Sequence, residues 1–190
     1  MHVYHLLDGV ALMRYWSIVL SLLLFVPSLA IAQGKLTPRP LDPVSVDTFA
    51  RAVEGSAVVR ALVERLEASN VIVHIETVPQ MPEGIGGMTR FVTSRGGYRY
   101  LRVSLGSTLT LRLRAAILGH ELKHACEVAD SSATDVESMR ELFEHEGHRA
   151  GQYYETLAAI NVERSVLMEL RATVSRLRSG QALQAEPVIK

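Results

Sequence analysis

This chain has very little cysteine: Cys126 is the only one among its 190 residues. A single cysteine cannot form an intramolecular disulfide, which argues against a disulfide-stapled extracellular module. An excess of charge of one sign is also missing, because 20 Lys and Arg balance 20 Asp and Glu. Without a basic footprint or a charged tail, no nucleic-acid partner is expected. The length, with no internal repeats, fits one domain with its own core.

A long apolar run is present only near the N-terminus, where Arg14 precedes the sequence YWSIVLSLLLFVPSLAIA. The run is short for a membrane span and ends in the small-x-small pattern A-I-A, directly before Gln33. These features predict a cleaved signal peptide over residues 1–32 and a secreted or periplasmic protein. The alternative is an uncleaved leader, which would be the only membrane contact expected. No cysteine near the cleavage point supports a lipid anchor.

The remainder of the chain divides into three parts. Residues 33–46 are rich in proline and polar residues and predict an extended linker; residues 47–180 form the folded domain and residues 181–190 a tail. Hydrophobic periodicity and turn residues predict the following elements: a helix over 47–69 broken at Gly55-Ser56, a strand over 71–78, a hairpin of strands 88–94 and 98–105, and helices over 107–129, 134–147 and 152–178. This order predicts an α+β fold, with a small, mostly antiparallel sheet packed on helices and a long C-terminal helix.

The helix expected over 107–129 carries His120, Glu121 and His124 in the spacing H-E-x-x-H. Residues four apart share one face of a helix, so the two imidazoles can aim at one ion. Glu121 is rotated by about 100° from His120, which keeps it from being a ligand but within reach of a bound water. The competing interpretation is a solvated polar stripe on a core helix.

Each residue type in this spacing has a chemical role. Neutral imidazoles suit Zn²⁺, and the ion lowers the pKa of a bound water to about 7. A carboxylate beside that water can accept its proton as the water attacks a carbonyl. The sequence therefore predicts one Zn²⁺ per chain, with Glu121 as the general base.

A catalytic zinc needs a third protein ligand and one open position. Glu155, expected at the start of the last helix, is the favoured third ligand, because the small residues after it permit close helix approach. The competing interpretation is a glutamate that stabilises the first turn of that helix. Glu127, Glu144 and Glu163 are alternative ligands. Glu127 is interpreted either as an orienting partner for a ligand histidine or as a surface carboxylate.

With these two motifs, the sequence resembles a zincin metallopeptidase of the gluzincin type. In that group the H-E-x-x-H helix is completed by a glutamate from a following helix. The segment ETLAA, residues 155–159, is similar to the E-x-x-A-D motif of CAAX-prenyl-protease-like peptidases, and the compact size is similar to minimal gluzincin domains. The resemblance covers about residues 71–171. It implies a zincin-like fold, ligands at His120, His124 and Glu155, and hydrolysis of a peptide or protein substrate.

Two positions depart from the family pattern. Ala159 stands where the family has an aspartate, and Lys123 stands where zincins usually carry an uncharged residue. The second hypothesis is therefore a catalytically inactive zinc-binding scaffold or sensor of the cell envelope. In zincin-like folds the strand before the motif helix is often an edge strand that pairs with the substrate. The strand over 98–105 is therefore expected either to pair with the substrate or to be a plain hairpin strand.

Further side chains near the motifs have a functional and a structural interpretation. His145 and His148 could donate to a transition state, but surface positions near a helix end are expected. The phenol of Tyr153 or Tyr154 could stabilise an oxyanion, although packing is expected. Cys126 is expected to be a small buried hydrophobe.

Overall fold

The computed structural model describes residues 37–151 and 153–184. These residues all belong to one unit, Lys35–Lys190. The signal peptide expected over residues 1–32 and the end of the tail lie outside the described residues. Across the described part of the chain, none of the helices has the length and apolar character needed to span a bilayer.

The first described segment is not a linker throughout. Strand β1 (Arg39–Pro40) pairs in parallel with the next strand, and helix α2 (Pro43–Gly55) begins three residues later. Asp42 caps α2 because its carboxylate accepts from the backbone N–H of Ser45, while the Ser45 hydroxyl accepts from the N–H of Asp42. The linker expected over residues 33–46 therefore overlaps structured chain from Arg39 onward.

A second helix, α3 (Ala57–Glu67), follows α2 directly. Ser56 separates the two helices in an extended conformation, and its hydroxyl accepts from the backbone N–H of Val59. The break expected at Gly55-Ser56 is confirmed.

The main sheet contains β1, β2 (Val71–Val78), β3 (Gly87–Arg95) and β4 (Tyr98–Gly106) in the order β1-β2-β4-β3. The α+β class is confirmed, but the sheet is mixed, because β4 pairs in parallel with β2 and antiparallel with β3. Of the two interpretations of the strand over 98–105, the edge strand is wrong and the plain hairpin strand is confirmed: β4 is central and β3 is the edge. The inward side chains of β4 are buried: Leu101, Val103 and Leu105, with Arg99 at one end. Their apolar members are paired on β3 with Phe91, Thr89 and Gly87, which are only partly buried. The more buried strand therefore occupies the covered position.

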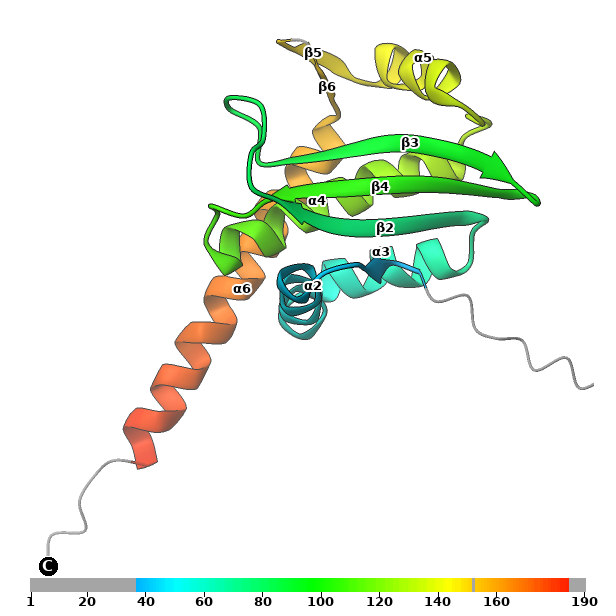
Figure 1. Cartoon of the computed structure of the whole chain (residues 1–190). Helices are drawn as coiled ribbons and strands as arrows, with labels where there is room; N and C mark the ends of the chain where they lie inside the picture. The colour runs from blue at the N-terminus through cyan, green and yellow to red at the C-terminus, as the bar shows by residue number, and fades with distance from the viewer. Residues whose placement is uncertain (1–36, 152, 185–190) are drawn as a thin grey trace, which may run out of the picture. The chain divides into compact units, whose positions relative to one another are not determined.

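Helix α4 (Leu111–Asp130) carries the H-E-x-x-H sequence and packs along one face of the sheet (Figure 1). Thr110 caps it through a hydrogen bond from the N–H of Leu113. Helix α6 (Leu157–Gln184) packs against the other side of α4. A Cβ atom on Gly119 of α4 would lie 2.9 Å from Val166 of α6, so the glycine permits this close approach.

Between α4 and α6 the chain forms helix α5 (Val136–Glu146) and a small hairpin of β5 (His148–Ala150) and β6 (Tyr153–Glu155). The capping box of α5 uses Asp135 and Ser138, one residue later than the expected Thr134 and Glu137. The last helix begins at Leu157 rather than near residue 152, and it continues past Gly180. Glu155 therefore lies on β6 and not in a helical turn.

Arg99 on β4 holds the C-terminal end of α4. Arg99 is 7% exposed, and its guanidinium donates to Asn70 Oδ1 and to four main-chain carbonyls. These carbonyls belong to Val128, Ala129, Ser131 and Ala133. Acceptors at the end of a helix have no intrahelical partner, so Arg99 satisfies groups that would otherwise be buried unpaired.

We expect Arg99→Gln to lower the free energy of unfolding by about 2–4 kcal/mol, because several buried acceptors lose their donor. Urea denaturation followed by circular dichroism measures this loss. The matched control is Arg95→Gln, a change of an exposed arginine on β3, for which a change within about 0.5 kcal/mol is expected. Equal effects of the two substitutions would contradict a structural role for Arg99.

Candidate metal centre

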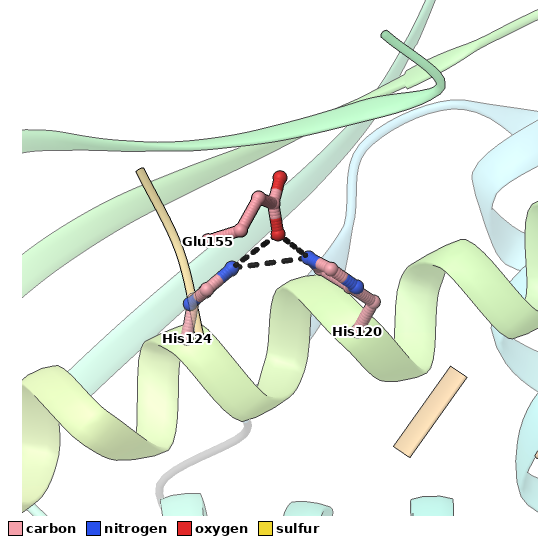
Figure 2. Close-up of side chains that lie close together, drawn as sticks. All are labelled: His120, His124 and Glu155. Carbon is pink, nitrogen blue, oxygen red and sulfur yellow. Dashed lines mark hydrogen bonds and ion pairs between the residues drawn. The ribbon is translucent and has the colours of Figure 1, made fainter. Parts of the chain in front are cut away.

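Three side chains converge between α4 and β6: His120, His124 and Glu155 (Figure 2). His120 Nε2 lies 2.8 Å from Glu155 Oε2, and His124 Nε2 lies 3.6 Å from the same oxygen. The two Nε2 atoms are 3.0 Å apart. Both imidazoles are buried, while the glutamate is half-buried. This group could hold a metal ion.

The spacing of the donor atoms is compatible with a small bound cation. Two nitrogens each 2.0–2.1 Å from a tetrahedral ion lie about 3.3 Å apart, close to the observed spacing. Among the described residues, buried Glu155 Oε2 has no hydrogen-bond partner, although His120 Nε2 is near, because the approach is out of line with a ring N–H. An acceptor oxygen that faces two imidazole nitrogens completes a donor set that could hold a cation.

Four carboxylates give the group a negative potential: Glu121, Glu127, Glu155 and Glu163. Burial opposes the charged form of His120, but Glu155 and Glu163 raise its pKa to about 10. Burial likewise opposes charge on His124, while Glu127 and Glu155 raise its pKa to about 9. The surroundings therefore favour positive charge at the imidazoles, which protons or a divalent cation can supply.

A carboxylate lies close to the far nitrogen of each ring, with a hydrogen bond at His124 and a longer contact at His120. His124 Nδ1 lies 2.8 Å from Glu127 Oε2, and the hydroxyl of Thr156 donates to Glu127 Oε1 at 2.8 Å. Of the two interpretations of Glu127, the orienting partner is the one that the structure supports. Glu163 on α6 lies 3.3 Å from His120 Nδ1, on the side away from the convergence point. These contacts leave both Nε2 atoms facing Glu155.

We expect Glu127→Gln to weaken metal binding about 10- to 100-fold, because the amide holds the ring of His124 less firmly and lowers its basicity. Competition with a chromophoric chelator measures the affinity. Glu146→Gln is the matched control, since it removes a carboxylate from the exposed end of α5. If Glu127→Gln binds as tightly as this control, Glu127 does not orient a ligand.

Glu121 is buried beside the three converging side chains, against the edge strand β3. The hydroxyl of Thr89 donates to Glu121 Oε2 at 2.7 Å. A Cβ atom on Gly87 would lie 2.8 Å from Glu121 Oε1, so the glycine makes room for the carboxylate. Burial raises the pKa of Glu121, although the two imidazoles and the Thr89 hydroxyl oppose this shift. A carboxylate with a raised pKa is a better proton acceptor near neutral pH.

A cleft of about 480 Å³ opens onto this group. Glu121, His124 and Glu155 are among the residues that line it. One wall is formed by residues 87–91 of β3, and the opposite wall by α5 and β6. Phe143 of α5 packs edge-on against the ring of His124, with ring centroids 5.0 Å apart. The cleft gives an extended ligand access to the glutamate and to the converging side chains.

Several residues considered from the sequence lie elsewhere. Glu144 accepts from Arg140 and from the Tyr154 hydroxyl, so it is not part of the converging group. His145 and His148 are exposed, as expected. Both tyrosines of β6 line the cleft. The ammonium of Lys123 lies 3.7 Å from Glu127 and outside the lining of the cleft.

Cys126 is 2% exposed and belongs to the hydrophobic core, as expected. Burial raises the pKa of its thiol to about 12. It is therefore a packing residue on the inner side of α4.

Two residues of the site were not considered from the sequence. Thr156 both supports Glu127 and caps α6, because its hydroxyl accepts from the N–H of Ala159. A threonine directly before a helical apolar pattern is a cap signal that could have placed the start of α6. Thr89 has no local signal, since its role depends on the packing of β3 against α4.

No protein-family model, curated protein or solved structure matches this chain. The function is therefore inferred from the geometry of the site.

Proposed function

We propose that this chain is a zinc-dependent hydrolase of peptide bonds. The observation that carries the proposal is the convergence of His120, His124 and Glu155 beside a cleft that is lined by His124, Glu155 and buried Glu121. A donor set of two imidazoles and one carboxylate suits Zn²⁺ and leaves a fourth position for water or substrate. When bound, Zn²⁺ would polarise a carbonyl and lower the pKa of a water molecule.

Residues of the chain supply the remaining parts of the reaction. Glu121 accepts the proton of the attacking water and passes it to the leaving amine. Thr89 fixes one carboxylate oxygen of Glu121, so the other can face the cleft. Glu127 and Glu163 keep the two imidazoles in a productive orientation. The carboxylate of Glu163 lies one helical turn beyond Ala159, and this placement offers the support that the family aspartate would give.

The edge strand β3 is the proposed guide for substrate. It is the edge of the main sheet and forms a wall of the cleft, so its free backbone groups can pair with an extended peptide. The cleft also presents apolar side chains from both walls, among them Phe91, Met139 and Phe143. Peptides with large apolar side chains are therefore the favoured substrates.

Hydrolysis of a fluorogenic peptide library by the purified chain tests the proposal. Activity is expected to disappear with a chelator and to return when Zn²⁺ is added. Zinc binding without hydrolysis of any library peptide would instead support the second hypothesis, an inactive zinc-binding scaffold. Hydrolysis that persists after complete removal of metal would contradict both.

A further inference from the structure

A row of basic side chains crosses the face of the main sheet that points away from α4. In the strand register, Arg90 on β3 is paired with Arg102 on β4. Arg102 is paired in turn with His74 on β2, and His74 with Arg39 on β1. Paired residues on neighbouring strands point to the same face, so these four side chains form one line, called here the basic row. With strands about 4.8 Å apart, the line is about 15 Å long.

No described helix covers this face, which is turned away from α4 (Figure 1). The inward residues Leu101 and Val103 of β4 are fully buried, whereas the side chain of Arg102 between them is 43% exposed. The side chain of Arg90 is 57% exposed. The basic row is therefore accessible to a ligand.

The basic row carries a net positive charge. Glu76 is the one carboxylate on the four strands of the sheet, and it is shared by Arg102 at 3.7 Å and Arg90 at 4.0 Å. One carboxylate cannot neutralise both of the guanidinium groups that share it. The potential also acts on His74: burial lowers the pKa of this imidazole, and the charges of Arg39 and Arg102 lower it further.

This arrangement is unfavourable for the sheet alone. Like charges directly opposite each other on antiparallel strands are destabilising, and Arg90 and Arg102 are such a pair, whose repulsion the shared Glu76 offsets only in part. An anionic ligand placed along the basic row would remove this repulsion.

The basic row leads into the cleft. Arg90 stands at its end on the edge strand and also lines the cleft that contains Glu121 and Glu155. A linear anion lying along the row would therefore pass over β3 and continue towards the candidate metal centre. The cleft beyond it has apolar walls that fit peptide side chains better than sugar-phosphate or lipid headgroups.

We propose that the basic row binds an acidic segment of the polypeptide substrate, whose neighbouring apolar residues enter the cleft. This inference rests on the proposed peptide hydrolase function. An extended peptide rises about 3.3 Å per residue, so about five residues cover the row and two or three of their carboxylates face it. The substrate class is therefore a polypeptide with a glutamate- or aspartate-rich stretch beside an apolar cleavage site.

Binding without turnover tests the inference. A fluorescent peptide with five glutamates followed by an apolar segment is titrated with zinc-loaded Glu121→Gln protein, and fluorescence anisotropy gives the dissociation constant. A peptide with glutamines in place of the glutamates is the reference. At low salt the acidic peptide is expected to bind about tenfold more tightly, and this advantage is expected to fall with added salt.

The row variant combines Arg39→Gln with Arg102→Gln, neither of which lines the cleft. It is expected to lose the roughly tenfold advantage of the acidic peptide and to bind the glutamine peptide unchanged. The control combines Arg112→Gln with Arg171→Gln, which removes two exposed charges from α4 and α6 and is expected to keep the advantage. Equal binding of the two peptides, or an advantage that survives in the row variant, would overturn the inference.

The same variants distinguish the acidic peptide from two other possible ligands of the basic row, anionic phospholipid and single-stranded nucleic acid. Row-dependent binding of vesicles rich in anionic phospholipid, or of oligothymidylate, without row-dependent binding of the acidic peptide would also overturn the inference. If the hydrolase proposal fails and the basic-row inference holds, no peptide is cleaved, yet the row variant still loses its preference for the acidic peptide. If wild-type protein cleaves neutral and acidic peptides with the same KM, the hydrolase proposal stands and the inference fails.

Discussion

Glu121→Gln is expected to retain zinc and to lose hydrolytic activity by a factor of about 10² to 10⁴. The amide has nearly the shape of the carboxylate and can keep the contact with Thr89, but it cannot accept a proton from the attacking water. The loss is expected in kcat, with little change in KM, because the missing interaction belongs to the transition state. Steady-state hydrolysis of a fluorogenic peptide and elemental analysis of the same sample give both readouts.

The matched control for this experiment is Glu144→Gln, which removes an exposed carboxylate from α5 outside the converging group. This variant is expected to keep both zinc and activity. Full activity of Glu121→Gln would eliminate Glu121 as general base. Loss of zinc together with activity would show instead that Glu121 supports the metal centre.

Glu155→Ala is expected to weaken zinc binding by at least about 10²-fold, because the cation loses its one anionic ligand and keeps only the two imidazoles. The neighbouring Tyr153→Phe change leaves all three donor atoms in place and is expected to bind zinc as wild type does. Competition titration against a chelator measures both affinities. Equal affinities for the two variants would show that another carboxylate, such as Glu163, completes the site.

Local sequence patterns predicted the central part of the site. The helix over 107–129 and the strand over 71–78 correspond to α4 and β2. Because His120 and His124 lie on one helix, their mutual geometry follows from the helical repeat alone. The core positions of α4 were predictable for the same reason.

The element that carries Glu155 could not be predicted from the same rules. The residue was placed beside the histidines, and the structure brings the three side chains together, but on β6 instead of a helix. The strands β5 and β6 have three residues each, too short for a periodic pattern. Only the Thr156 cap marks the start of α6 in the local sequence.

Strand order also depended on tertiary packing. Both hairpin strands were predicted near their observed positions, yet sequence neighbours gave no reason for β4 to pair with β2. The inward residues differ in burial: Leu101, Val103 and Leu105 on β4 are fully buried, whereas their partners on β3, Phe91, Thr89 and Gly87, are partly exposed. As a result, β3, which borders the cleft, is the exposed edge strand of the main sheet.

The most direct test of the metal centre is the zinc content of the full chain after equilibrium dialysis against excess Zn²⁺ and then against metal-free buffer. We expect one zinc per wild-type chain, and none in the variant that combines His120→Ala, His124→Ala and Glu155→Ala. Circular dichroism of the variant checks that it remains folded. A wild-type chain that retains no zinc, or a folded triple variant that retains one equivalent, would contradict the proposed site.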